Sequence, residues 1–69
     1  MRVFEEGDSV VIECTDTERS SKGTVVRTGR DNTITVTLDE ARGTLLVFKQ
    51  VKPKLFVGNT SGLEFVIKV

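Results

Sequence analysis

Residues 32–40, NTITVTLDE, decide the fold class of this chain. Three aliphatic side chains alternate there with three hydroxyl side chains: Ile34, Val36 and Leu38 with Thr33, Thr35 and Thr37. Successive side chains of a β-strand point to opposite faces of the sheet, so this alternation separates an apolar face from a polar one. The stretch therefore predicts a strand that buries one face.

Two other stretches show the same period of two residues, namely residues 9–14, SVVIEC, and residues 62–69, GLEFVIKV. Valine, isoleucine and threonine make up about a third of the chain, and these β-branched residues favour strands. By the same alternation, Cys14 is expected on the buried face of the first strand, and Val11 and Val66 on outer faces. The predicted core is centred on six side chains: Ile34, Val36, Leu38, Leu63, Phe65 and Ile67.

Short polar segments separate the expected strands. The step Gly7-Asp8 precedes the first strand, and Asp8 is expected to hydrogen-bond the backbone of that turn. Pro53 is expected to end a strand or to lie at an edge, because proline donates no ladder hydrogen bond. Residues 15–23, TDTERSSKG, and residues 58–62, GNTSG, are predicted to form loops.

Five or six short strands joined by hairpins would leave exposed edges in an open sheet, and closure into a barrel removes those edges. A chain of 69 residues is long enough for one small domain. We therefore predict an all-β fold in which residues 1–69 form a single small barrel of antiparallel strands.

Seven residues in the first half of the chain resemble SH3-like barrels of the KOW type. They follow the pattern F-x-x-GD-x-V-x-I and then KGTVV: Phe4, Gly7, Asp8, Val10, Lys22, Gly23 and Val25. The resemblance implies that the barrel is SH3-like. KOW-type domains commonly bind RNA or ribosomal and transcription proteins, so the resemblance also implies a partner of one of these kinds. The chain departs from these domains in its neutral net charge and in the long polar stretch after residue 14.

A second stretch, residues 58–65, GNTSGLEF, is similar to the Asx-x-Ser-x-x-Gly element of PilZ-type split barrels at Asn59 and Ser61. That resemblance implies binding of a cyclic dinucleotide. Glu64 stands where the element has its glycine, and Arg27 and Arg30 are one residue closer together than the arginines of the PilZ motif.

The residues needed for most catalytic and metal chemistry are missing from the sequence. The chain has no histidine and a single cysteine, Cys14, so it lacks the usual general base near neutral pH and the ligands of a Cys/His zinc site. It also lacks the tryptophan and tyrosine that build the ligand surfaces of peptide-binding SH3 domains and methyl-lysine readers. We expect no catalytic residue, no metal, no cofactor and no enzymatic activity.

Charge is unevenly distributed although the formal net charge is zero. Residues 1–18 carry six carboxylates and one arginine, whereas residues 19–54 carry eight basic and three acidic side chains. Lysine on an edge strand also discourages edge-to-edge aggregation, so a solvated edge is the alternative interpretation of the basic residues. The candidate contact patch consists of Arg27, Arg30, Arg42, Lys49, Lys52 and Lys54.

The N-terminal stretch lacks the apolar core of a signal peptide, and no apolar run is long enough to cross a bilayer. We expect a soluble, cytoplasmic protein without membrane contact. The favoured function is that of a non-catalytic binding or adaptor module, whose partner is another protein or a second copy joined as a homodimer through Val11 and Val66. The alternatives are a KOW-like nucleic-acid (RNA) binding domain that uses the basic patch and, less favoured, cyclic-dinucleotide binding.

Overall fold

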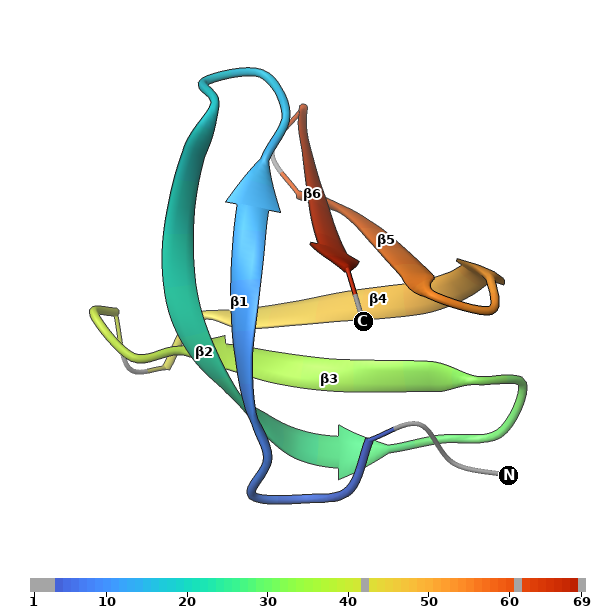
Figure 1. The fold of residues 1–69 in the computed structure, drawn as a ribbon. Coiled ribbons are helices and arrows are strands. Elements are labelled where there is room, and N and C mark those ends of the chain that lie inside the picture. The colour runs from blue at the N-terminus through green and yellow to red at the C-terminus, as the bar shows by residue number, and fades with distance from the viewer. Residues whose placement is uncertain (1–3, 42, 61, 69) are drawn as a thin grey trace.

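The computed structural model describes residues 4–41, 43–60 and 62–68. Each strand pairs antiparallel with the next, and the last pairs with the first, so the sheet closes into a barrel (Figure 1). This confirms the prediction of a small all-β antiparallel barrel, and the arrangement is compatible with an SH3-like barrel. The six strands within the described residues are β1 (Ser9–Cys14), β2 (Arg19–Thr28), β3 (Thr33–Leu38), β4 (Leu45–Lys52), β5 (Leu55–Thr60) and β6 (Leu63–Lys68).

The barrel closes over a short seam between β1 and β6. Only two residue pairs are in register there, Glu13 with Val66 and Cys14 with Phe65, whereas β1 and β2 share six pairs. The Thr15 N–H extends the seam by donating to the Glu64 carbonyl oxygen at 3.0 Å. In Figure 1 the two strands meet near the end of β1 and diverge away from it.

Two β-bulges bend the longest strands. The register between β2 and β3 shifts between Val25 and Arg27, and the register between β4 and β5 shifts between Gln50 and Lys52. A bulge increases local twist and bends its strand. Six short strands therefore wrap around a single core, with β2 running ten residues around the barrel.

The Gly-Asp step before β1 forms the turn that its sequence predicts. Gly7 has a φ of 94°, a conformation that side chains disfavour, and the Asp8 carboxylate accepts a 2.8 Å hydrogen bond from the Glu5 N–H. The Gly7 N–H donates to the Val25 carbonyl at 2.7 Å, and the Val25 N–H donates to the Asp8 carbonyl at 2.9 Å. The turn thus attaches the start of the chain to the middle of β2.

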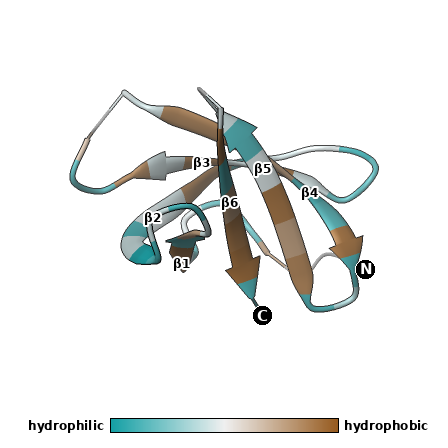
Figure 2. Ribbon diagram, turned by 90° about the horizontal axis from the view of Figure 1, so that it is seen from above, coloured by the Kyte–Doolittle hydropathy of each residue, from teal (hydrophilic) through white to brown (hydrophobic). Residues whose placement is uncertain are grey.

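The core consists of aliphatic side chains around two phenylalanine rings. Figure 2 shows bands of hydrophobic and hydrophilic residues along the strands, as expected where one face is buried. Phe4, Leu38 and Phe65 are partly buried and pack against this cluster. The buried members are Val10, Ile12, Val25, Ile34, Val36, Leu46, Phe48, Phe56 and Ile67.

The predicted core is therefore confirmed for Ile34, Val36 and Ile67 and in part for Leu38 and Phe65. It is wrong for Leu63, which is 36% exposed. Leu63 is the first residue of β6, and it lies at the end of the barrel, where fewer strands surround a side chain than in the middle.

The prediction that Val66 is exposed is also wrong, since only 8% of it is accessible. Val66 lies between Glu13 of β1 and Val57 of β5 in the ladder. Two residues further along β6, the Lys68 ammonium lies 3.8 Å from the Glu13 carboxylate. These neighbours leave Val66 little exposed surface, so the expected homodimer contact through Val11 and Val66 lacks one of its two residues. Val11 is 55% exposed, as predicted.

Two segments predicted as loops are largely strand. The polar stretch after Cys14 turns within residues 15–18, and β2 begins at Arg19, where Ser20, Ser21 and Lys22 pair with β1. Similarly, β5 continues through Gly58 and Asn59 to Thr60. Ser61 lies outside the described residues.

Gly58 is a glycine because β5 lies directly against β4 at this position. A Cβ atom there would lie 2.5 Å from the Val47 carbonyl oxygen and 3.2 Å from the Phe48 ring. We expect Gly58→Ala to destabilise the barrel by about 1–3 kcal/mol, the usual range for overpacking.

Denaturant melts test this expectation, with Gly29→Ala as the matched control. The nearest atom to an added Cβ at Gly29 is the Thr33 carbonyl oxygen at an ordinary 3.6 Å. If both variants lost the same stability, β5 would be free to move away from β4, and the close approach would not constrain the fold.

Candidate functional site

Two residues of the predicted basic patch lie on one outer face of the barrel. Arg27 of β2 pairs with Thr35 of β3, and Lys49 of β4 pairs with Thr33 of β3. Both basic side chains are exposed. Since Thr33 and Thr35 are alternate residues of one strand, Arg27 and Lys49 lie diagonally across β3 on the same side of the sheet.

The other described residues of the predicted basic patch lie at one end of this face. Arg30 belongs to the β2–β3 turn, whereas Lys52 ends β4 and Lys54 lies in the β4–β5 turn. The Gln50 N–H donates to the Asn32 carbonyl oxygen at 3.0 Å, which holds the β2–β3 turn against the end of β4. The structure therefore brings the described residues of the predicted patch to one region. Asp31 is the acidic residue of the β2–β3 turn. Arg42 lies outside the described residues.

The same face carries large apolar side chains that the patch prediction did not include. Leu45 is 60% exposed and Val47 is 56% exposed. They pair with Thr37 and Thr35, so both point to the outer side of β3 and β4. We call this surface the outer face: Arg27, Thr33, Thr35, Thr37, Leu45, Val47 and Lys49.

All four phenylalanines, which are the chain's only aromatic residues, lie inside the barrel or against its core. Phe48 and Phe56 are buried, and Phe4 and Phe65 pack against the core cluster. Proteins that bind single-stranded nucleic acid stack bases on exposed aromatic rings. The outer face offers hydroxyl, aliphatic and cationic groups, and no stacking surface.

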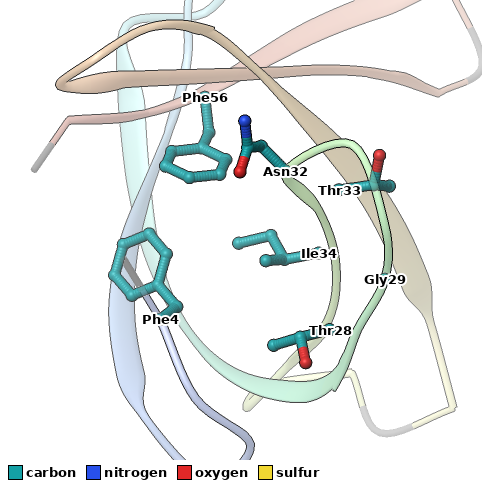
Figure 3. A pocket seen from close by; sticks show the side chains of 7 residues that line it. All are labelled: Phe4, Thr28, Gly29, Asn32, Thr33, Ile34 and Phe56. Atoms are coloured by element: carbon teal, nitrogen blue, oxygen red, sulfur yellow. The ribbon is translucent and has the colours of Figure 1, made fainter. Parts of the chain in front are cut away.

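One end of the barrel is closed by Phe4. Its ring centroid lies 5.2 Å from that of Phe56, with the ring planes tilted by 57°. Figure 3 shows the two rings beside Ile34 and Asn32 around a pocket of about 30 Å³. Ligand pockets for small molecules are typically about ten times larger or more, so this end of the barrel is filled by core side chains.

The other end of the barrel holds a larger pocket beside Cys14. It measures about 190 Å³. Cys14 itself is buried, as its place in β1 predicts. Three apolar lining residues are only partly covered: Leu38, the last residue of β3, Leu63, the first residue of β6, and Phe65. The complete lining is Ile12, Cys14, Thr17, Arg19, Ser21, Leu38, Leu63 and Phe65. We call this the Cys14 pocket.

Local hydrogen bonds lower the pKa of the Cys14 thiol. The largest effect comes from the Thr17 side chain, and the Thr17 and Asp16 backbones add to it. Desolvation and the nearby Asp16 charge act in the opposite direction but do not outweigh them. This stabilisation could not be predicted from the sequence, because it arises from the conformation of the turn that follows Cys14.

Carboxylates gather around the same end. The Asp16 carboxylate accepts a 3.1 Å hydrogen bond from the Glu64 N–H, and the Glu64 carboxylate accepts one of 3.1 Å from the Thr15 hydroxyl. Glu18 lies beside Cys14 and Arg19 in the neighbouring surface hollow. The carboxylates of Asp16, Glu18 and Glu64 therefore lie at the end of the barrel that holds the Cys14 pocket.

The structure does not bring Arg27 and Arg30 next to Asn59. Arg27 and Arg30 lie on β2 and the β2–β3 turn, whereas Asn59 lies on β5, and β3 and β4 separate them. Among residues 4–41, 43–60 and 62–68, no cluster of three or more metal-ligating side chains is found. The described part of the chain also contains no helix able to span a membrane.

No family model, curated protein or solved structure matches this chain.

The Thr17 hydrogen bond predicts a measurable pH effect on Cys14. Thr17→Val removes the hydroxyl and should raise the thiol pKa, so the pH midpoint for alkylation moves upward and labelling slows below that midpoint. Thr15→Val is the control, because the Thr15 hydroxyl bonds Glu64. Iodoacetamide labelling across pH measures both. Identical midpoints for the unmodified protein and Thr17→Val would contradict the assigned cause.

Proposed function

We propose that this barrel is a non-catalytic protein-binding module and that its outer face is the contact surface. The observation that carries the proposal is the pair Leu45 and Val47, each more than half exposed and two residues apart on the same face of β4. Binding surfaces commonly combine an apolar centre with a polar rim. Here the aliphatic pair would be the centre, and Arg27, Lys49 and the threonines of β3 would be the rim.

The chemistry of the outer face supports binding rather than catalysis. Its side chains are aliphatic, hydroxyl or permanently cationic near neutral pH, so none of them is suited to accept and return a proton. An arginine fork binds a carboxylate through two hydrogen bonds, and lysine adds a point charge. The partner surface that fits is therefore apolar at its centre and acidic at its edge.

Site-specific photocrosslinking tests this proposal with a matched pair of positions. A benzophenone side chain at Val47 should crosslink a discrete partner in cells, whereas one at Val11 should not. Val11 is the appropriate control because it is 55% exposed, against 56% for Val47, and lies on β1. The partner should then bind the purified barrel, and Val47→Asp should weaken that binding about tenfold or more.

The result would contradict the proposal if both positions captured the same proteins equally, or if Val47→Asp left the purified complex unchanged. Circular dichroism and denaturant melts establish that Val47→Asp remains folded, which is expected because Val47 is on the surface.

Nucleic-acid binding is the second candidate function, supported by Arg27, Arg30 and Lys49 beside the hydroxyls of Thr33 and Thr35. Lysine, arginine and threonine are common phosphate contacts. If these residues contact phosphates, affinity for generic RNA or duplex DNA should fall steeply with salt, and Lys49→Gln should reduce the slope by about one. Under the favoured proposal, titration with both nucleic acids gives at most weak binding, which Lys49→Gln does not alter.

A further inference from the structure

The two ends of the barrel differ in how they are covered. Phe4, which lies outside the strands, packs on Phe56 and closes one end. At the other end, Leu38 and Phe65 are half-buried and Leu63 is 36% exposed. Among the described residues, no side chain from outside the strands closes this second end as Phe4 closes the first.

The Cys14 pocket has the size and lining to accept one aliphatic side chain. Its volume of about 190 Å³ is similar to that of an engineered apolar cavity of about 150 Å³ that binds benzene. Ile12, Leu38 and Phe65 provide apolar walls. Burying an aliphatic side chain in such a pocket removes apolar surface from water on both partners.

The surroundings of the pocket favour a partner with positive charge. The Asp16 carboxylate acts electrostatically on Cys14 and accepts a hydrogen bond from the Glu64 N–H. The Glu64 carboxylate accepts one from the hydroxyl of Thr15, the residue after Cys14, so both carboxylates lie near the pocket. Glu18 lies beside Cys14 and Arg19. Arg19 is the cation among the pocket's lining residues, and these three carboxylates outnumber it.

The chain itself carries an aliphatic side chain surrounded by lysines. Val51 is 55% exposed and lies in the β4 bulge between Gln50 and Lys52. Lys54 follows in the adjoining turn. This segment lies away from the pocket along β6. Lys52 pairs with Leu55, which pairs with Lys68 at the end of β6, whereas the pocket residue Leu63 is at the start of β6. In Figure 1 the β4–β5 turn and the β1–β2 turn are well separated.

We propose that Val51 of one copy inserts into the Cys14 pocket of a second copy, with Lys52 and Lys54 facing the carboxylates of Asp16, Glu18 and Glu64. The two contacting surfaces are different and lie at different ends of the molecule. Such a heterologous contact leaves a free Val51 and a free pocket on every pair, so association continues head to tail.

This assembly is weak and depends on salt. One inserted valine and a few exposed ion pairs make a contact at the small end of the range for specific interfaces, which is typical of transient complexes. Screening shortens the reach of the charges to about 8 Å at physiological ionic strength. Association is therefore expected at high protein concentration and low salt. The proposal does not rest on a role for the outer face, whose apolar residues Leu45 and Val47 are not part of this contact.

Two blocked variants test the head-to-tail geometry. Val51→Glu replaces the inserting side chain with a negatively charged one, and Leu63→Lys places a cation at the pocket rim. Both positions are at least one-third exposed, so both variants should fold. Sedimentation velocity at low salt should show concentration-dependent oligomers for the unmodified protein and monomers for each variant alone, with association weakened about tenfold or more.

Mixing the two variants is the decisive experiment. The Val51→Glu copy keeps its pocket and the Leu63→Lys copy keeps its Val51, so the equimolar mixture should form a dimer and nothing larger. Alkylation of Cys14 provides a second readout, because an inserted side chain should slow labelling of the Val51→Glu copy only when the Leu63→Lys copy is present. Val11→Glu is the control, and it should oligomerise like the unmodified protein.

Three outcomes would overturn the proposal. A monomer at every concentration would show that the pocket and Val51 do not meet. Oligomers of the unmodified protein combined with a monomeric mixture would place the contact elsewhere. Monomers of Val11→Glu would point to an interface on β1. Failure of this test leaves crosslinking at Val47 unaffected, so the two proposals are judged separately.

Discussion

The close approach of β5 to β4 at Gly58 is the constraint on which the barrel depends. With no side chain at this position, the β5 backbone lies against the Val47 carbonyl and the Phe48 ring. A flat sheet of six strands would keep a side chain's width between its surface and any other backbone. The missing Cβ lets the sheet curl over Phe48, which is fully buried. Val47, the residue before Phe48 on β4, points outward to the solvent because successive side chains of a strand alternate between the two faces of the sheet.

The sequence predicts the strands better than it predicts their exposure. Strict alternation in β3 fixes the inward side of Ile34 and Val36, because a slip of one residue would reverse every side chain. The two-residue alternation does not predict which neighbouring side chains cover a residue that points outward. Val66 is covered by its cross-strand neighbours, whereas Leu63 is exposed because its strand begins there. Both outcomes depend on pairing between distant segments. The polar residues 19–21 and the segment 58–60 likewise became strands through their partners, against their local turn signals.

The candidate surfaces show the same difference between features that the local sequence predicts and features that depend on pairing between distant segments. The distribution of charge along the sequence predicted the basic patch, and the structure brings the described residues of that patch to one region. The apolar centre of the outer face had a signal that the patch prediction did not use: residues 45–48, LLVF, are apolar at every position, so a single strand cannot bury them all on one face. The Cys14 pocket had no such signal, because its walls come from four strands that meet at the end of the barrel.

A small barrel must cover two ends with few residues, and this chain covers them unequally. Phe4 reaches one end from outside the strands, which keeps the core residue Phe56 from solvent. At the other end, the exposed rim residue Leu63 contributes little to the core, whereas Ile67, four residues further along β6, is buried within it. Truncating a buried isoleucine typically costs about 2–5 kcal/mol, and changes at surface positions usually stay within about 0.5 kcal/mol. An exposed residue at this end, such as Leu63, can therefore change without unfolding the barrel, whereas buried residues such as Ile67 specify the fold.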